Sequence, residues 1–205
     1  MKKVKQILIT SRPQQITKNF LVLVPLFFTI NIWFNQEDIS GMMAIILKSL
    51  FAFLISILMS TAVYYINDLL DINQDKNHPK KKYRPIAKGD ISINLAIFIA
   101  SILVVSSLIF STVISSQMFL ATFLYLILNI LYSIYLKNLA IVDILCISAS
   151  FVIRAIMGSI AIDHSIITIN ENQIELDLAI SPWLYVVTGL GSLMLAIGKR
   201  KSEIK

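Results

Sequence analysis

The chain has 205 residues, of which 57% are hydrophobic and only 15% are charged. So few charged side chains cannot cover a water-exposed surface, so the composition excludes a soluble domain and indicates a bilayer as the solvent. Eighteen Lys and Arg against twelve Asp and Glu give a net charge of +6. Because these cations are interleaved with apolar segments and lack a pattern of stacking aromatic residues, they favour anionic lipids or phosphate substrates over nucleic acid.

Six apolar segments along the chain are candidates for membrane spans, since a helix needs about 20 apolar residues to cross the hydrocarbon core. In chain order they cover residues 20–33, 42–66, 95–114, 118–136, 141–162 and 182–197. The first and the last are the shortest. Because no internal repeat or linker divides them, we expect one all-α integral membrane domain over residues 1–205.

The N-terminus carries Lys2, Lys3, Lys5 and Arg12 around a short apolar run at 7–9, with no small-residue cleavage site after it. This pattern does not fit a cleavable signal peptide. We therefore expect the first span to remain in the membrane.

Lys and Arg gather in alternate connections between the predicted spans, which places them on one side of the membrane. These basic regions are the N-terminus, residues 76–88, Lys137 and residues 199–201. The opposite connections contain no Lys or Arg and cover residues 35–41, 115–117 and 163–181. By the positive-inside rule, the basic side and the N-terminus are predicted to be cytoplasmic, in a multi-pass protein of the cell membrane. The last opposite connection is predicted to be an external loop with a short hairpin and no catalytic role.

An acidic motif of Asn67, Asp68, Asp71 and Asp75 follows the second predicted span with spacings of one, three and four residues. In a continuing helix, the spacings of three and four place these oxygen ligands on one face. Three carboxylates within two turns repel one another, so the motif requires a positive partner. Mg2+ prefers such oxygen ligands and joins them to substrate phosphates. The alternative is a solvated helix end with nearby lysines as counter-ions.

The segment 78–89 contains two prolines and a glycine, which predict a loop directly after the acidic motif. Its lysines and Arg84 would face the acids. Metal could then neutralise one side of a pyrophosphate and cationic side chains the other. Arg84, fixed before Pro85, is the strongest candidate for ligand contact. The alternative for the lysines is a positive-inside membrane anchor.

Arg154 lies inside the fifth predicted span, where a charge costs about 2.5–3.5 kcal/mol and therefore indicates a function. Asp143 is too far along the same helix for an ion pair, at about 16 Å by helical rise. We expect a lipid phosphate or a carboxylate from another helix as the partner of Arg154. The alternative is an arginine that snorkels to the surface. Lys18 and Lys137, at the ends of predicted spans, are candidates for phosphate binding or plain anchors.

Cys146 is the only cysteine, which excludes an intramolecular disulfide and a cysteine metal cluster. His78 and His164 fall in different connecting loops, so a histidine metal site is not expected.

Several stretches resemble the UbiA-type polyprenyl transferases. The sequence YINDLLD at 65–71, with Asp75, His78-Pro79, Lys82 and RPIAKG at 84–89, resembles the first aspartate-rich region of that family. The remaining similar stretches are RPQQITKN at 12–19, YSIYLK at 132–137, Asp143, Arg154, Gly158 and GKRKSE at 198–203. Together they cover nearly the whole chain and are most similar to the decaprenyl-phosphate phosphoribosyltransferase branch.

This resemblance implies a bundle of transmembrane helices around a cavity open to the cytoplasm and to lipid. It implies a Mg2+-dependent transfer of 5-phosphoribosyl from phosphoribosyl pyrophosphate to a polyprenyl phosphate. The catalytic residues would be Asp68, Asp71 and Asp75, which with Asn67 would hold the metal. The substrate-binding residues would be Lys18, Asn67, Lys82, Arg84, Lys137, Arg154, Lys199 and Arg200.

One departure from the family is the number of helices, since its members usually have nine and only six are predicted here. We therefore expect a domain that is incomplete at its C-terminus, with a separate C-terminal half as a candidate partner. Two alternatives to phosphoribosyl transfer stay open. The first is prenyl transfer from a polyprenyl diphosphate to an aromatic or glycerol-type acceptor. The second is an inactive fragment or one half of a split enzyme.

Overall fold

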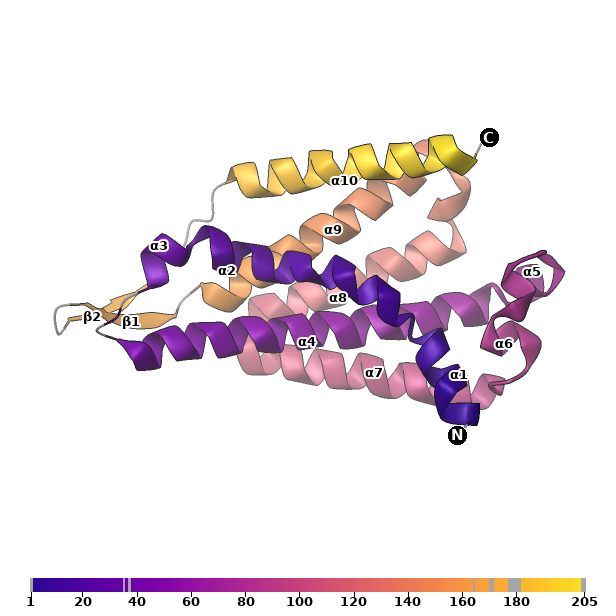
Figure 1. Ribbon diagram of the computed structural model, residues 1–205, viewed down its shortest axis with the longest axis horizontal. Coiled ribbons are helices and arrows are strands. Elements are labelled where there is room, and N and C mark those ends of the chain that lie inside the picture. Colours follow the sequence, from indigo (N-terminus) through magenta and orange to yellow (C-terminus); the bar gives the residue numbers. More distant parts are fainter. Residues whose placement is uncertain are drawn as a thin grey trace.

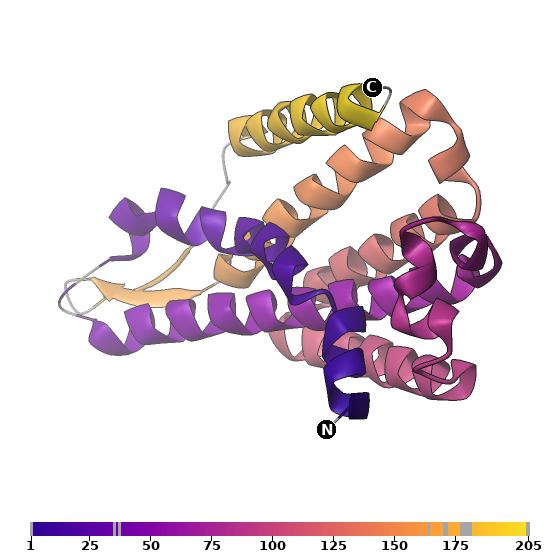
Figure 2. The same cartoon turned by 45° about the vertical axis from the view of Figure 1, so that its right-hand side comes forward.

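The computed structural model describes residues 2–34, 36, 38–163, 165–169, 172–176 and 182–203. Long helices run side by side through the molecule, and short elements gather at its two ends (Figures 1 and 2). The four longest spans are α4 (Ile39–Leu70), α7 (Ile93–Ile114), α8 (Ser116–Ile134) and α9 (Ala140–Ile162). Each is long and apolar enough to cross a membrane. The second to fifth predicted spans are therefore confirmed.

The last predicted span is also helical. It forms α10 (Pro182–Glu203), whose apolar part, Pro182–Gly198, is shorter than the four long spans. α10 packs on α9 through polar contacts: the Ser148 hydroxyl donates to the Gly189 carbonyl at 2.9 Å, and Tyr185 donates to Ser159 at 3.0 Å. Small residues and hydroxyl groups of this kind allow helices to associate closely in a membrane.

The first predicted span is not one helix. It is divided into η1 (Pro13–Leu23), α2 (Val24–Phe28) and α3 (Ile30–Trp33). Pro25 has no amide hydrogen to donate within a helix. Thr29 leaves the helical conformation at φ −105° and ψ 11°, and its hydroxyl donates to the Pro25 carbonyl at 2.8 Å. The prediction of a continuous span at 20–33 is therefore wrong, because apolar length alone does not reveal these two breaks.

Gly158 explains how η1 lies against α9. A Cβ atom at this position would stand 2.0 Å from the Val22 carbonyl oxygen, so only glycine permits this approach of the two backbones. The same contact region contains the apolar core of Val22, Ala52, Ile55, Met118 and Met157. η1 is therefore held between α4 and α9, near the middle of the bundle.

The short elements divide between the two ends of the molecule. The N-terminal α1 (Lys2–Thr10), α5 (Ile72–Asn77) and α6 (Pro85–Lys88) lie at one end with the C-terminal end of α10 (Figure 1). Two further turns, η2 (Lys81–Tyr83) and η3 (Leu136–Asn138), belong to the connections α5–α6 and α8–α9. The basic connections therefore share one end, as predicted.

At the opposite end, the predicted hairpin is present. Strand β1 (Ile166–Ile169) pairs antiparallel with β2 (Asn172–Glu175), with Ile166 opposite Glu175. His164, named above, lies outside the described residues.

Candidate functional site

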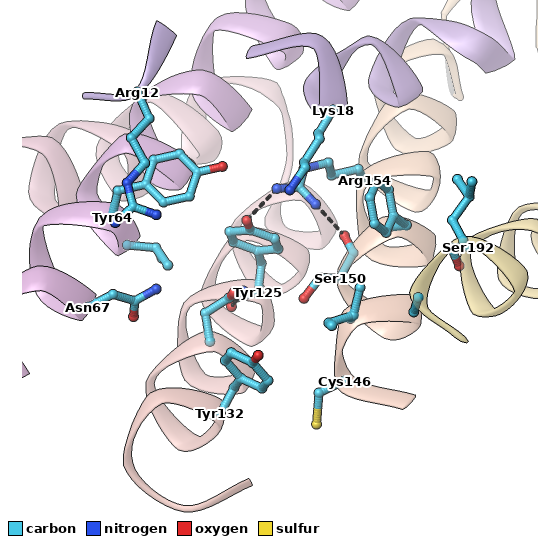
Figure 3. A pocket seen from close by; sticks show the side chains of 16 residues that line it. Arg12, Lys18, Tyr64, Asn67, Tyr125, Tyr132, Cys146, Ser150, Arg154 and Ser192 are labelled. Carbon is cyan, nitrogen blue, oxygen red and sulfur yellow. Dashed lines mark hydrogen bonds between the residues drawn. The ribbon is translucent and has the colours of Figure 1, made fainter. Parts of the chain in front are cut away.

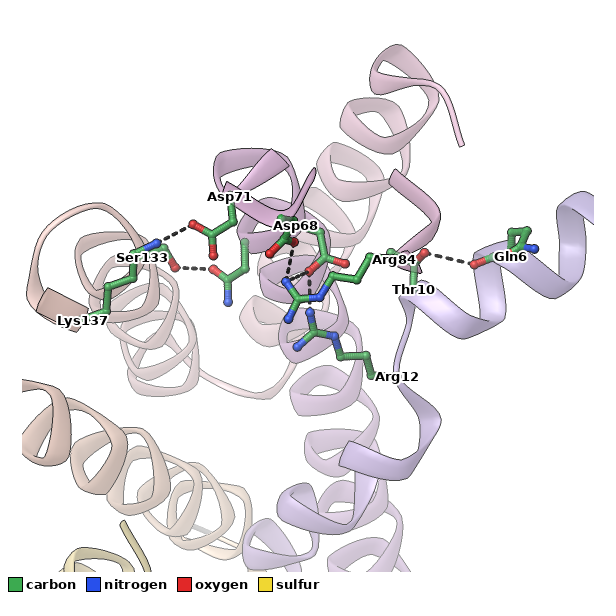
Figure 4. A network of polar contacts seen from close by, with 10 residues as sticks. Gln6, Thr10, Arg12, Asp68, Asp71, Arg84, Ser133 and Lys137 are labelled. Carbon is green, nitrogen blue, oxygen red and sulfur yellow. Dashed lines mark hydrogen bonds and ion pairs between the residues drawn. The ribbon is translucent and has the colours of Figure 1, made fainter. Parts of the chain in front are cut away.

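The acidic motif lies where α4 ends. α4 stops at Leu70, Asp71 occupies its C-terminal cap, and α5 begins at Ile72. The side chains of Asp68 and Asp75 are both buried, with 2% of each exposed. They converge on one guanidinium: Nη1 of Arg84 lies 2.7 Å from Asp75 Oδ2 and 3.2 Å from Asp68 Oδ1 (Figure 4). Arg84 thus faces the acids, as the loop sequence predicted.

Asp71 points elsewhere and forms an ion pair with Lys137, which follows α8 in η3 (Figure 4). The motif is therefore divided into a pair, Asp68 and Asp75, and a separate Asp71. The expected single face of oxygen ligands is not found, because the helix changes direction at Asp71. Within the described parts of the chain, no three His, Cys, Asp or Glu side chains lie close enough together to share a metal ion.

Arg12 joins the motif from 56 residues away. It follows α1 and has φ 49° and ψ 62°, a left-handed conformation that is rare for a residue with a Cβ. The side chain of Arg12 forms an ion pair with Asp68, and its guanidinium lies 5.0 Å from the ring centre of Tyr64. Because the conformation turns the chain between α1 and η1, it places a second cation on the buried Asp68.

A cavity of about 410 Å³ opens beside the motif, between η1, α4, α8, α9 and α10. Asn67 is the member of the acidic motif that lines it, and Ser133 donates a hydrogen bond to the Asn67 side-chain oxygen. Figure 3 shows Asn67 and Arg12 on one side of this space and Arg154 on another. The polar and aromatic lining residues are Arg12, Lys18, Tyr64, Asn67, Tyr125, Asn129, Tyr132, Ser150, Phe151, Arg154 and Ser192.

The lining of the cavity is basic. Among the described residues that form it are three cationic side chains, Arg12, Lys18 and Arg154, and no Asp or Glu. Asp143 is fully buried and accepts a hydrogen bond from the Tyr132 hydroxyl at 2.8 Å. Such a cavity favours an anionic ligand.

Arg154 is buried, with 4% of the residue exposed, and neutral groups hold its guanidinium. Nε donates to Asn19 Oδ1 at 2.9 Å, Nη1 to the Ser150 carbonyl at 3.0 Å and Nη2 to the Tyr125 hydroxyl at 2.6 Å (Figure 3). No carboxylate among the described residues forms an ion pair with it. The expected carboxylate from another helix is therefore not found, and the snorkelling alternative is wrong because the side chain stays inside.

The other predicted residues divide into those near the cavity and those apart from it. Lys18 lines the cavity, and Lys137 pairs with Asp71 of the acidic motif. Lys82 lies in an exposed loop with its ammonium over the ring of Tyr83, so it is not brought to the site. Lys199 and Arg200 belong to α10, and their side chains are outside the described part of the structure.

Several site residues were not singled out from the sequence, among them Arg12, Tyr125, Asn129 and Ser150. Arg12 stands in a stretch that resembles the family, which was a usable signal. Tyr125 and Ser150 have no motif around them. Only the packing of α8 against α9 reveals that Tyr125 meets Arg154, whereas Ser150 lies one turn before Arg154 in α9 itself.

The donor set at the motif suits a magnesium ion in kind, because Asn67, Asp68, Asp71 and Asp75 supply hard oxygen ligands. Each carboxylate is also met by a cationic side chain, which shows that the site requires positive charge. A metal ion would have to replace Arg84 between Asp68 and Asp75. The oxygen donors of the motif therefore fit magnesium in kind.

The fold and the site define a multi-pass membrane protein with a divided acidic motif above a basic cavity. The model of the UbiA prenyltransferase family matches residues 21–201, so the chain belongs to this family. The resemblance seen in the sequence is confirmed.

Two curated relatives are decaprenyl-phosphate phosphoribosyltransferases. The protein of Mycolicibacterium smegmatis is 31% identical over 196 residues, which cover 95% of this chain and 55% of the relative. The protein of Corynebacterium glutamicum is also 31% identical, over 94% of this chain and 53% of its own length. The chain thus spans about half the length of the curated relatives that it matches.

Solved structures show the same fold. A digeranylgeranylglyceryl phosphate synthase has a TM-score of 0.72 at 21% identity, over 98% of this chain and 62% of that one. A UbiA homologue from Archaeoglobus fulgidus, bound to GPP and Mg2+, has a TM-score of 0.63 at 18% identity, over 98% of this chain and 64% of that one. The all-α membrane fold predicted from the sequence is confirmed.

Proposed function

We propose that this chain is a Mg2+-dependent transferase that moves 5-phosphoribosyl from phosphoribosyl pyrophosphate to a polyprenyl phosphate. The observation that carries the proposal is the basic cavity, with no acidic side chain among its described lining residues, beside a motif of carboxylates. Both substrates are phosphates, so both suit this charge. The two relatives, which are decaprenyl-phosphate phosphoribosyltransferases, support the same reaction.

In this proposal, Asn67, Asp68, Asp71 and Asp75 would hold the magnesium ion. When bound, it would stabilise the negative charge on the departing pyrophosphate. Arg12, Arg84 and Lys137 meet these carboxylates in the structure. Arg12, Arg84 and Lys137 would also supply charge-assisted hydrogen bonds to the pyrophosphate oxygens, which are strong.

The transfer requires one bond to form and one to break. An oxygen of the polyprenyl phosphate attacks C1 of the ribosyl group, and the bond from C1 to the pyrophosphate oxygen breaks. The electron pair of that bond leaves with the pyrophosphate. No covalent enzyme intermediate is needed, so positioning and electrostatic stabilisation supply the catalysis.

Prenyl transfer to an aromatic acceptor fits the cavity less well. A prenyl donor carries its only charge on the diphosphate, which the acidic motif and its cations already accommodate. An aromatic acceptor would then leave the buried Arg154 without an anion. A phosphate acceptor or a sugar phosphate donor removes this conflict.

We further propose that residues 1–205 form one domain, with the motif and the N-terminus facing the cytoplasm of a cell membrane.

The test is an incorporation assay on the purified protein in lipid nanodiscs. Radiolabelled phosphoribosyl pyrophosphate, Mg2+ and a polyprenyl phosphate are supplied, and label in the lipid phase is measured. Transfer that requires Mg2+ and is lost in Asp71→Asn is expected. Asp90→Asn is the matched control, because Asp90 pairs with Lys88 on the surface. Folded protein that labels no lipid would contradict the proposal.

A further inference from the structure

Arg154 marks a place in the cavity apart from the acidic motif. We propose that Arg154, with the Tyr125 hydroxyl and Lys18, binds the phosphate monoester group of a substrate. This inference rests on the proposed function and names the part of the site that takes the second anion. The shared chemistry is a terminal phosphate, carried either by the polyprenyl lipid or by the 5-position of the sugar.

The positive charge of Arg154 is the first feature that points to an anionic ligand. Arg154 stands more than half way along α9, where an uncompensated cation is costly in a membrane. Among the described residues, the salt bridges of Arg12, Arg84 and Lys137 all end on acids, whereas Arg154 has none. The rings of Tyr125 and Phe151 lie 4.8 and 5.6 Å from its guanidinium and give partial compensation. An anion from outside the chain would supply the rest.

The guanidinium of Arg154 also has N–H donors that the described residues do not use. A guanidinium has five N–H donors, and the described residues accept from Arg154 at three places. Within the described residues, one N–H on Nη1 and one on Nη2 are left for a ligand. Because a guanidinium binds phosphate with two parallel hydrogen bonds, this remaining capacity matches one phosphate group.

The guanidinium of Arg154 is also preorganised by its buried neighbours. Asn19, which accepts from Nε of Arg154, is itself fixed by α4: Ser56 donates to its side-chain oxygen at 2.9 Å, and its amide donates to Ser60 at 3.1 Å. All four side chains are buried. The guanidinium is therefore held in one orientation before a ligand arrives, which lowers the entropic cost of binding.

The position of Arg154 relative to the acidic motif also suits a second anionic group. Ser60, which bonds to Asn19, and Asn67, which lines the cavity at the motif, both belong to α4. They are separated by seven residues, or about 10 Å of helical rise. The two ends of the cavity can therefore hold two anionic groups with a sugar ring between them. A diphosphate at the motif would leave Arg154 to the second phosphate.

The experiment measures binding without metal and without turnover. Purified protein in nanodiscs is titrated with geranyl phosphate or with ribose 5-phosphate, and geraniol and ribose serve as uncharged partners. The rise in melting temperature with ligand concentration gives the affinity. Saturable binding of at least one phosphate, with none for its uncharged partner, is expected. The phosphate that binds identifies the source, and failure of both phosphates would overturn the proposal.

Arg154→Met tests the residue itself. Methionine fills a similar length of apolar space, so we expect an unliganded melting temperature equal to or above that of the parent protein. Phosphate affinity should fall by about 30-fold or more, since charged hydrogen bonds are lost. Arg154→Lys keeps the charge without the two-pronged geometry and should bind with intermediate affinity. Unchanged affinity in Arg154→Met would overturn the proposal.

Lys48→Met is the matched control. Lys48 is another cation in a membrane helix, but its ammonium donates to Ser165 near the hairpin and it lines a different pocket. Its loss should leave phosphate affinity unchanged. The two proposals can fail separately: phosphate binding at Arg154 without any transfer contradicts the proposed reaction, whereas transfer with normal affinity in Arg154→Met contradicts this inference.

Discussion

The two ends of the cavity differ in the partners of their cationic side chains. At the motif, Arg12, Arg84 and Lys137 each meet a carboxylate, and the acids come from the end of α4 and from α5. At Arg154, the cation is held by amide, carbonyl, hydroxyl and aromatic groups. Paired charges can exchange partners when a metal or diphosphate arrives. A cation fixed by neutral groups keeps its full charge for an anionic ligand.

The largest effect is expected when the paired end loses its central acid. Asp68→Ala leaves Arg12 and Arg84 without the carboxylate that they share, and removal of one partner of a buried pair costs about 3–5 kcal/mol. Because the arginine side chains are 26–29% exposed, about 2–3 kcal/mol is expected here. Thermal unfolding in detergent measures it, with Asp90→Ala as the control. A loss no larger than that of the control would show that the motif is not a coupled cluster.

Gly158→Ala should disturb the other end. The new Cβ would meet the Val22 carbonyl, so η1 must move away from α9, and Asn19 moves with it. Overpacking of this kind costs about 1–3 kcal/mol. Gly191→Ala is the control, because no atom stands within 4 Å of its Cβ and alanine favours a helix by about 1 kcal/mol. Equal melting temperatures for the two variants would contradict the close contact.

Substitution of Lys137, which lies at the site, is expected to affect transfer more than substitution of Lys82, which lies outside it. Lys137→Gln removes the partner of Asp71 and should lower transfer by about 10-fold, the effect of one charged hydrogen bond. Lys82→Gln changes an exposed loop and should leave the rate within about twofold of the parent. Steady-state transfer rates of the two variants and the parent protein test this difference. The reverse order would place the second substrate at the α5–α6 loop.

Arg84→Gln gives the smallest expected effect and tests partner exchange directly. If Arg84 occupies the place of a metal between Asp68 and Asp75, its removal should strengthen Mn2+ binding by several-fold, because a positive charge that competes with the metal is gone. Mn2+ titration followed by electron paramagnetic resonance measures the affinity. Weaker Mn2+ binding would show that Arg84 supports the metal site and does not compete with it.

Apolar length was sufficient to predict α4, α7, α8 and α9, because a bilayer requires one kind of segment. It failed at the first span, where Pro25 and Thr29 break the helix locally without changing its apolar character. A short hairpin was expected within residues 163–181 from their polar composition, and β1 pairs with β2 there.

The site was only half accessible to sequence reasoning. The spacing of Asp68, Asp71 and Asp75 identified the motif, since it is local. The partners of these acids are not local: Arg12 is 56 residues from Asp68, and Lys137 is 66 residues from Asp71. Asn19, one of the three hydrogen-bond partners of Arg154, is 135 residues away. Contacts over such separations depend on helix packing, which no motif in one sequence specifies.

A crossed binding experiment tests the central claim that the two ends act separately. Pyrophosphate with Mg2+ and geranyl phosphate or ribose 5-phosphate without Mg2+ are titrated into the parent protein, Asp68→Asn and Arg154→Met. The account predicts that Asp68→Asn loses metal-dependent pyrophosphate binding and keeps phosphate binding, while Arg154→Met does the reverse. If either variant lost both ligands while its fold was retained, or if neither lost any, the division of the cavity into two anion sites would be contradicted.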